Sequence, residues 1–279
     1  MSIFLRQSRV ALRISGPEAG KLLNDVLTAT IKQQSGIARW WALLTPQGKI
    51  IAEGLISWHN DAFWLDVAAD FAADFFKRMR MYKLRAKVEI EDLSVTHAVG
   101  WSEKRLENAD FIVAKDIRTD GMGYRVIAPQ AACRDWVADE TEFAAKRIAL
   151  GIGEMGADFA PNTMFPHDIG MDLLGGVDFK KGCYVGQEVV SRMHHRSTAR
   201  RRPLIVSNIE VHEENSVMAG DREAGRIGQQ VNGVAVGFLR LDRLGGAKKA
   251  SIAAKRVILA APEWASYDFS DSDRNQTGT

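Results

Sequence analysis

The octapeptide KGCYVGQE, residues Lys181 to Glu188, is the part of this sequence that carries the most chemical information. It places Cys183, one of only two cysteines in the chain, between Gly182 and Gly186. Glycine adopts backbone angles that other residues avoid and lets the main chain approach a ligand closely. We therefore expect Cys183 to lie on a tight turn that a ligand can reach.

The residues that follow Cys183 predict a helix. Apolar side chains recur at helical spacing from Gln187 onward, so the free amides of the first helical turn are expected near the thiol. The positive end of that helix, together with Lys181 and Arg192, favours a thiolate over a thiol. A small buried cysteine on a glycine turn is the alternative, since free cysteine is often part of the core.

The composition of the whole chain excludes several classes of protein. Cys133 and Cys183 are far apart among 279 residues and form no CxxC pair, which excludes a disulfide framework and a four-cysteine zinc site. The N-terminus has no continuous apolar stretch, and no window approaches the length of a membrane span. We therefore expect an unprocessed cytoplasmic protein that binds no membrane.

Common catalytic and metal-binding motifs are absent from the sequence. There is no P-loop, no GxSxG, no HExxH and no GxGxxG after a strand. His194 and His195 are adjacent, so on a helix they point about 100° apart and do not form an i, i+4 metal pair. No metal site is predicted.

Two clusters of positive charge interrupt an otherwise balanced chain. The net charge is +2, so direct nucleic-acid binding is not expected of the protein as a whole. A solvated surface explains such clusters in most proteins, and recognition of an anionic partner, such as a polyglutamate tail or RNA, is the sharper alternative. The two clusters are Lys77, Arg78, Arg80, Lys83, Arg85 and Lys87, and Arg200, Arg201 and Arg202.

Alternation and helical periodicity predict a β-rich chain with inserted helices. Asn232 and Gly233 form an apt two-residue hairpin turn in a separate C-terminal β-barrel, and the polar residues after 265 predict a disordered tail. The predicted strands are 10–14, 38–44, 50–58, 63–67, 84–90, 95–101, 111–114, 124–127, 204–209, 225–231 and 234–241. Ser15 followed by Glu18 is a capping-box signal for a helix through Leu22, Leu23 and Val26. The other predicted helices are 71–81, 131–138, 140–150 and one that starts at Gln187.

The octapeptide and its surroundings resemble the YgfZ branch of the glycine-cleavage T-protein family. LLGGVDFK at 173–180 precedes the octapeptide, and the likeness covers nearly the whole chain in the family's order. The branch contains folate-binding proteins that support iron-sulfur enzymes, and a mitochondrial iron-sulfur assembly factor is a relative. The other matching segments are LLNDVLTATI (22–31), LLTPQGKI (43–50), DIRTDGMGYR (116–125), RIALGIG (147–153) and FPHDIGMD (165–172).

The resemblance implies an α+β fold of three lobes arranged as a cloverleaf, with tetrahydrofolate bound in the central opening. The first lobe is expected at 1–48 with 143–199, where it carries the cysteine loop, and the second at 49–142. A small C-terminal β-barrel is expected at 200–265, and the tail at 266–279. Cys183 is then expected to face the folate pocket.

The chain departs from the members of the family that transfer an aminomethyl carbon. Those proteins carry a paired aspartate where this chain has Ala52 and Glu53, and a YTGE segment where it has RTDG at 118–121. A carboxylate at the reacting nitrogen orients and polarises the folate amine. Glu53 is longer by a methylene, and a misplacement of about 1 Å lowers a rate by about 100-fold.

The leading hypothesis is a tetrahydrofolate-binding accessory protein that assembles or repairs iron-sulfur clusters in client enzymes, including tRNA-modifying ones. One cysteine cannot hold a cluster alone, so other ligands come from a dimer, a partner or glutathione, or Cys183 acts through thiol chemistry. One rival is an aminomethyltransferase that passes a one-carbon unit to tetrahydrofolate. The other is a non-catalytic module that binds a protein or tRNA.

Ten residues are candidates for the site. Cys183 is the predicted functional thiol and Lys181 its activator. Tyr184 stacks on a pterin or packs in the core, and Gln187 and Glu188 meet a pterin edge or cap the helix. Arg192 anchors the loop or a folate carboxylate. The remaining candidates for folate binding are Gly186, Arg118, Arg125 and Arg147.

Overall fold

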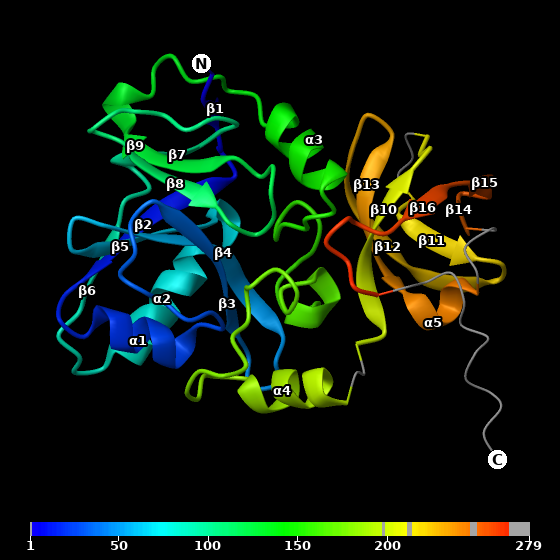
Figure 1. Ribbon diagram of the computed structural model, residues 1–279, viewed down its shortest axis with the longest axis horizontal. Helices are drawn as coiled ribbons and strands as arrows, with labels where there is room; N and C mark the ends of the chain where they lie inside the picture. The colour runs from blue at the N-terminus through cyan, green and yellow to red at the C-terminus, as the bar shows by residue number, and fades with distance from the viewer. Residues whose placement is uncertain (1, 197–198, 211–213, 246–249, 268–279) are drawn as a thin grey trace.

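The structure is a computed structural model that describes residues 2–196, 199–210, 214–245 and 250–267. Its larger part is one nine-stranded sheet with the order β1-β7-β9-β8-β3-β4-β5-β2-β6, and its smaller part is a seven-stranded C-terminal sheet (Figure 1). The strands of the larger sheet are β1 (Phe4–Leu5), β2 (Arg9–Ser15), β3 (Ile37–Leu44), β4 (Ile50–His59), β5 (Ala62–Ala68), β6 (Glu89–Asp92), β7 (His97–Ser102), β8 (Ile112–Asp116) and β9 (Tyr124–Pro129).

The hairpin of β3 and β4 is the centre of this sheet. Trp40 and Trp41 are neighbours on β3, so their side chains leave opposite faces, and both are fully buried in separate hydrophobic clusters. Gly48 turns the chain between the two strands with φ +80°. The first two implied lobes therefore share one sheet, and the predicted boundary at 48/49 falls inside a hairpin.

Two helices cover one face of the sheet. These are α1 (Ala19–Val26) and α2 (Ala72–Lys83), which lie beside each other in Figure 1. Phe75, Phe76 and Met79 of α2 recur at helical spacing and pack with Trp41 and Leu23. The opposite face of β3 and β4 packs against α3 (Thr141–Ala149) and the chain that follows it.

The segment from 151 to 186 contains only the short 3-10 helix η3 (Pro166–Ile169) and crosses between the two sheets before α4 (Gln187–His195). It is tightly packed rather than open, because Ile152, Ile169 and Met171 are completely buried. A Cβ added at Gly151 would lie 2.4 Å from Pro262, and one at Gly170 would lie 2.6 Å from Trp264. Glycine thus lets the C-terminal sheet come this close.

The C-terminal sheet has the order β15-β14-β11-β12-β13-β10-β16 and forms a nearly closed barrel. Asn232 and Gly233 both have positive φ, +50° and +74°, which confirms the predicted two-residue hairpin turn. The elements are β10 (Arg201–Ser207), β11 (Ser216–Ala219), β12 (Arg222–Val231), β13 (Val234–Arg240), α5 (Leu241–Leu244), β14 (Ala250–Ile252), β15 (Lys255–Arg256) and β16 (Ile258–Ala260).

Two predicted elements are wrong. The strand expected at 84–90 begins only at Glu89, because α2 runs to Lys83 and Leu84 then takes a positive φ. The helix expected at 131–138 is a 3-10 turn, η2 (Gln130–Ala132), followed by irregular chain. The predicted tail lies outside the described residues from 268 onward. Among the described helices, none is long and apolar enough to span a membrane.

Candidate functional site

The octapeptide forms a loop that is fastened to the hairpin of β3 and β4 through two glycines. Gly186 is the N-cap of α4 with φ +82°, and a Cβ there would lie 2.5 Å from the carbonyl oxygen of Thr45 and 3.2 Å from Cα of Gly48. Only glycine fits this close approach. Gly182 differs, since its φ is not positive and a Cβ there would meet no atom within 4 Å.

The loop presents Cys183 to solvent and buries Tyr184 beside it. Cys183 is exposed, which excludes the alternative of a buried core cysteine at this position, whereas Cys133 is the buried one of the pair. The amide of Gln187 donates to the carbonyl of Tyr184 at 3.2 Å and closes the turn before α4. Cys183 is therefore a free thiol at the surface, directly before a helix start.

Lys181 holds the loop against the chain that follows α1. Its Nζ donates to the carbonyls of Leu27 at 2.7 Å and Ala29 at 2.9 Å, and lies 5.3 Å from the ring centroid of Tyr184. Burial lowers the pKa of Lys181 to about 8. The contacts are those of a positioning residue, and its action on the Cys183 thiol stays a prediction.

A cavity of about 390 Å³ lies beside the loop, on the chain that leads into it. Phe179 and His194 are stacked at its wall, with ring centroids 3.8 Å apart and planes 16° apart. Its cations are Lys32, Arg39 and Lys180, and within the described residues none of these three side chains forms an ion pair. The cavity thus combines a flat aromatic wall with unmatched positive charge.

Asp178 is the carboxylate of this cavity, and its hydrogen bonds are already made. It accepts from the hydroxyl of Thr30, and Oδ1 accepts from the amide of Lys180 at 2.8 Å. The hydroxyl of Thr30 is the first cause of the lowered pKa of Asp178, and Lys181 contributes to it. Asp178 therefore stays ionised and shapes the loop while the three cations remain available.

Glu188 and Arg192 form an exposed pair on the first turns of α4. Nη2 of Arg192 donates to Oε1 of Glu188 at 2.6 Å, one helical turn away. Such i, i+4 pairs contribute a few tenths of a kcal/mol to a helix. Gln187 is half-buried at the helix start. Contacts of these three side chains with folate stay predictions.

The three other candidate arginines lie inside the protein, each beside a carboxylate. Arg118 binds Asp116 through Nε and Nη2, with Nη2 at 2.7 Å from Oδ2. Each of these guanidinium groups is buried and partnered, so its evident role is to stabilise the fold. The remaining pairs are Arg125 with Asp66 at 2.9 Å and Arg147 with Asp158 at 2.5 Å.

The pair of Arg125 and Asp66 continues into a buried network around Arg9. Arg9 lies 2.9 Å from Glu53 and 2.6 Å from Asp66. The pKa of Arg125 is lowered to about 10, chiefly by burial, with a contribution from Arg6 and Arg9 that opposes the attraction of Asp66. With Arg6 paired to Glu154 at 2.5 Å, three buried arginines thus face three buried carboxylates in this network.

Glu53, the candidate for the missing transferase aspartate, belongs to this network. Its Oε2 accepts from the indole of Trp40 at 2.7 Å, while Oε1 accepts from Arg9 at 2.9 Å and from the amide of Met155 at 3.3 Å. Glu53 is only 2 % exposed. A carboxylate with this many fixed partners is poorly suited to take a proton from a substrate.

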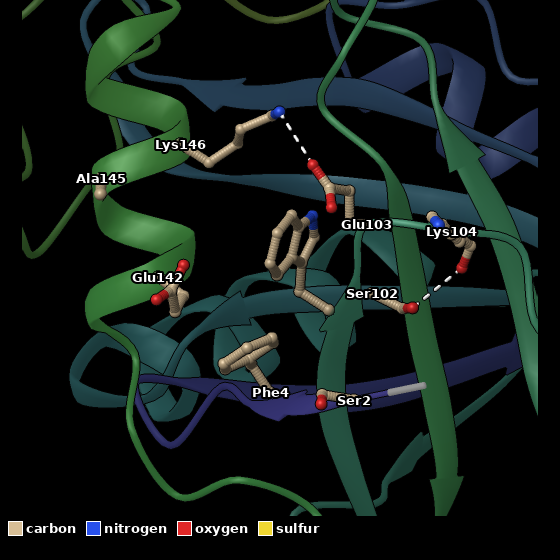
Figure 2. Close-up of a pocket in the computed structure, with 9 residues that line it drawn as sticks. Ser2, Phe4, Ser102, Glu103, Lys104, Glu142, Ala145 and Lys146 are labelled. Atoms are coloured by element: carbon tan, nitrogen blue, oxygen red, sulfur yellow. Dashed lines mark hydrogen bonds and ion pairs between the residues drawn. The ribbon is translucent and has the colours of Figure 1, made fainter.

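A larger cavity of about 680 Å³ lies away from the loop, between β1, the end of β7 and α3 (Figure 2). Figure 2 shows Glu142, Ala145 and Lys146 along α3, facing Phe4 and the strand end with Ser102 and Glu103. Nζ of Lys146 donates to Glu103 at 3.2 Å across its mouth. None of the residues that line this cavity belongs to the octapeptide, so its larger volume does not make it the candidate functional site.

The described residues contain no group of three or more His, Cys, Asp or Glu side chains arranged to hold a metal ion. Lys32, Arg39 and Phe179 line the cavity beside the loop, although the sequence did not predict them as site residues. The sequence gives little indication of these three residues, because single cations and a single phenylalanine occur on most protein surfaces. The fold brings them together from the chain after α1, from β3 and from the approach to the octapeptide.

Comparison with known proteins adds three findings. The family model for the C-terminal β-barrel domain of CAF17 matches residues 200–267. The mitochondrial iron-sulfur cluster assembly factor IBA57 homologue of Pyricularia oryzae is 32% identical over 214 residues, which are 71% of this chain and 55% of that protein. The mitochondrial iron-sulfur cluster assembly factor IBA57 of Mus musculus is 26% identical over 305 residues, which are 94% of this chain and 84% of that protein.

A further comparison, with a solved structure, concerns the fold. The crystal structure of glycine cleavage system aminomethyltransferase T from Bartonella henselae superimposes with a TM-score of 0.71 over 93% of this chain and 84% of that chain, at 13% identity. The predicted α+β fold with a C-terminal barrel is confirmed. The chain spans about half the length of the fungal relative. Its sequence is therefore similar to those of IBA57 iron-sulfur cluster assembly factors, and it has the fold of the glycine-cleavage T-protein.

Proposed function

We propose that this protein supports the assembly or repair of iron-sulfur clusters in client enzymes, including tRNA-modifying ones, as a cytoplasmic member of the YgfZ branch. The observation that carries the proposal is the exposed Cys183 on a loop that the fold positions firmly. The names of the relatives, which are called mitochondrial iron-sulfur cluster assembly factors, point the same way. Cys183 supplies one thiolate, and a cluster usually requires four ligands, so an assembly partner supplies the rest.

We also propose tetrahydrofolate as the ligand, with the cavity beside the loop as its place. A folate combines a flat pterin ring with a carboxylate tail, and the cavity combines a flat aromatic wall with three unmatched cations. Arg118, Arg125 and Arg147 fit this ligand less well, because each already faces a carboxylate. Bound folate would shield the cavity and orient the loop next to Cys183.

The contribution of the chain's own residues follows from their contacts. Lys181 and Gly186 hold the loop in place, one through two carbonyl oxygens and one through close packing. The start of α4 places its free amides after the loop, and such amides stabilise an anionic thiolate. These residues therefore keep Cys183 presented to a partner at a fixed position.

Complementation tests the role of the thiol. Cells that lack the protein receive the wild-type chain, Cys183→Ser or the matched control Cys133→Ser, and an iron-sulfur client enzyme is assayed under oxidative stress. We expect Cys183→Ser to fail and Cys133→Ser to restore activity, provided that both accumulate to wild-type levels. Full activity with Cys183→Ser would remove the thiol from the proposal.

Calorimetric titration with tetrahydrofolate tests the ligand separately. We expect binding that weakens at least about tenfold in Arg39→Gln and Lys180→Gln, because each removes a charge-assisted partner for a carboxylate. Glu188→Gln on the exposed face of α4 is the matched control. Unchanged affinity in the first two variants would place folate elsewhere.

The fixed hydrogen-bond partners of Glu53 disfavour aminomethyl transfer. The contacts of Arg202 within the protein disfavour tRNA binding through Arg200–Arg202. Arg202 donates to Asp172 at 2.7 Å and to the carbonyl of His167 at 2.9 Å, so it is used within the protein. Incubation with aminomethylated lipoyl carrier protein and tetrahydrofolate decides the first rival, because methylene-tetrahydrofolate either forms or does not.

A further inference from the structure

The basic residues between positions 77 and 87 form a positively charged surface without ion-pair partners among the described residues. It consists of exposed or half-buried side chains at the C-terminal end of α2 and in the turn after it. Within the described residues none of them forms an ion pair, although most arginines in the core do. The cations of this surface, here named the α2 patch, are Lys77, Arg78, Arg80, Lys83, Arg85 and Lys87.

Two large apolar side chains lie within the α2 patch and face solvent. Met81 is 65% exposed, and Leu84 is 86% exposed, more than any other large hydrophobic residue that the structure describes. The buried stripe of α2 is formed by Phe75, Phe76 and Met79, so these two side chains contribute nothing to that core. Exposed apolar groups of this size, surrounded by polar ones, are typical of contact sites.

The backbone conformation of Leu84 is strained, and the fold alone does not account for an exposed leucine in that conformation. Leu84 has φ +47° and ψ −110°, a conformation that residues other than glycine rarely adopt. A glycine there would end the helix with less strain and without an exposed leucine. Strain held at a surface position indicates that the side chain serves something other than the fold.

A hollow of about 540 Å³ lies beside Met81. It is lined by Phe76 and Met81 together with Lys77, Arg80 and the carboxylate of Asp92. An apolar hollow with a basic rim, with the exposed Leu84 in the same patch, is typical of a protein-binding surface, in which charges surround an apolar contact. A polyphosphate chain or a flat lipid surface would bring more negative charge to Asp92 and would leave the hollow unfilled.

We propose that the α2 patch is a docking surface for an acidic protein segment that carries an aliphatic side chain. The aliphatic group fills the hollow between Phe76 and Met81, Leu84 packs against the same segment, and carboxylates meet the surrounding cations. Opposite charges mainly accelerate the encounter and set specificity, while the apolar contacts supply most of the affinity. The proposal is independent of Cys183 and of folate.

Selection from a random peptide library tests it with the full chain as bait. We expect selected peptides to be rich in Asp and Glu around an aliphatic residue, and to bind more weakly as salt increases. Their affinity should fall at least about tenfold in Lys77→Gln/Arg80→Gln. The matched control, Lys104→Gln/Arg134→Gln, makes the same change in net charge on exposed side chains elsewhere and should bind normally.

Leu84→Gly separates docking from folding. We expect it to keep or raise the thermal midpoint, since it relieves the backbone at this position, yet to weaken the same peptides at least about tenfold. The proposal would be overturned if the selected peptides bound both variants as tightly as the wild type, or if no acidic peptide were recovered. So would patch-dependent binding of single-stranded RNA or of phosphatidylglycerol vesicles that is tighter than that of any selected peptide.

Discussion

The buried network around Arg9 and the loop around Cys183 use charge in opposite ways. In the network every cation faces a carboxylate at close range, as in the contacts of Arg9 with Glu53 and Asp66. At the loop the cations Lys32, Arg39 and Lys180 line a cavity without ion-pair partners among the described residues. Matched charge stabilises a fold, whereas unmatched charge is available to a ligand.

The difference separates a structural interior from an accessible surface region. In the interior, hydrogen bonds from Trp40 and Arg9 occupy the carboxylate of Glu53. The loop, where the thiol is exposed, retains open positive charge. Four variants follow that would break or sharpen this comparison.

Arg9→Met is expected to have the largest effect. It leaves Glu53 and Asp66 buried without their shared cation, and breaking a buried pair in this way lowers the free energy of unfolding by about 3–5 kcal/mol. Urea denaturation followed by tryptophan fluorescence measures the loss. Lys21→Met, which removes an exposed partner of Asp25, is the control and should leave the midpoint unchanged. Equal effects of the two variants would contradict the distinction between matched interior and surface charge.

His167 is expected to make the protein sensitive to acid. Burial lowers its pKa to about 4, and neither ring nitrogen has a hydrogen-bond partner among the described residues. The unfolded chain binds the proton at about pH 6.5, so the free energy of unfolding falls by about 3 kcal/mol as the pH falls from 6.5 to 4.

Denaturation of His167→Gln at pH 7 and pH 4.5 measures this contribution. The variant has no imidazole to protonate, so its stability should change less between the two pH values than that of the wild type. An identical pH dependence in the two proteins would assign the acid sensitivity to carboxylates such as Glu154. Burial alone would raise the pKa of Glu154, but Arg6 and Arg9 hold it well below its usual range.

Gly186→Ala tests the fastening of the loop. The positive φ and the approach to Thr45 each strain a Cβ at this position, and we expect a loss of about 1–3 kcal/mol in the free energy of unfolding. Gly182→Ala, in the same loop but with open space around it, should have no effect. If Gly186→Ala left the free energy of unfolding unchanged, the loop would not be held against the hairpin of β3 and β4.

Lys181→Gln is expected to have the smallest effect, about 1–2 kcal/mol, because it loses hydrogen bonds to Leu27 and Ala29. The rate at which Cys183 reacts with iodoacetamide separates two roles of this lysine. An activator of the thiol should slow the reaction when it is lost, whereas a tether alone should leave the rate unchanged or increase it. Lys180→Gln, which keeps the tether, is the matched control.

Local patterns predicted much of the sheet and of the loop, but none of the pairings in the network. The alternation in β2 to β5 and the Asn232-Gly233 turn depend on neighbours in sequence, and the octapeptide contains its own glycine, cysteine and helix start. The contact of Arg125 with Asp66 joins distant strands, and Arg125 was instead expected to meet folate.

The error at Leu84 shows a different limit. Its sequence neighbours favour a strand, yet α2 continues to Lys83 because Phe75, Phe76 and Met79 anchor it on the sheet. Tertiary packing thus outweighed local propensity at a place where the side chain points away from any core.

The unequal burial of the two cysteines allows the unaltered protein to be labelled at a single site. Cys133 donates to the carbonyl of Pro129 at 3.2 Å, and burial raises its pKa to about 11, whereas Cys183 is exposed. A maleimide dye or a spin label added to the unaltered chain should therefore attach at Cys183 alone. Such a probe would test, without any engineered cysteine, whether the proposed ligand or a partner changes the surroundings of the loop.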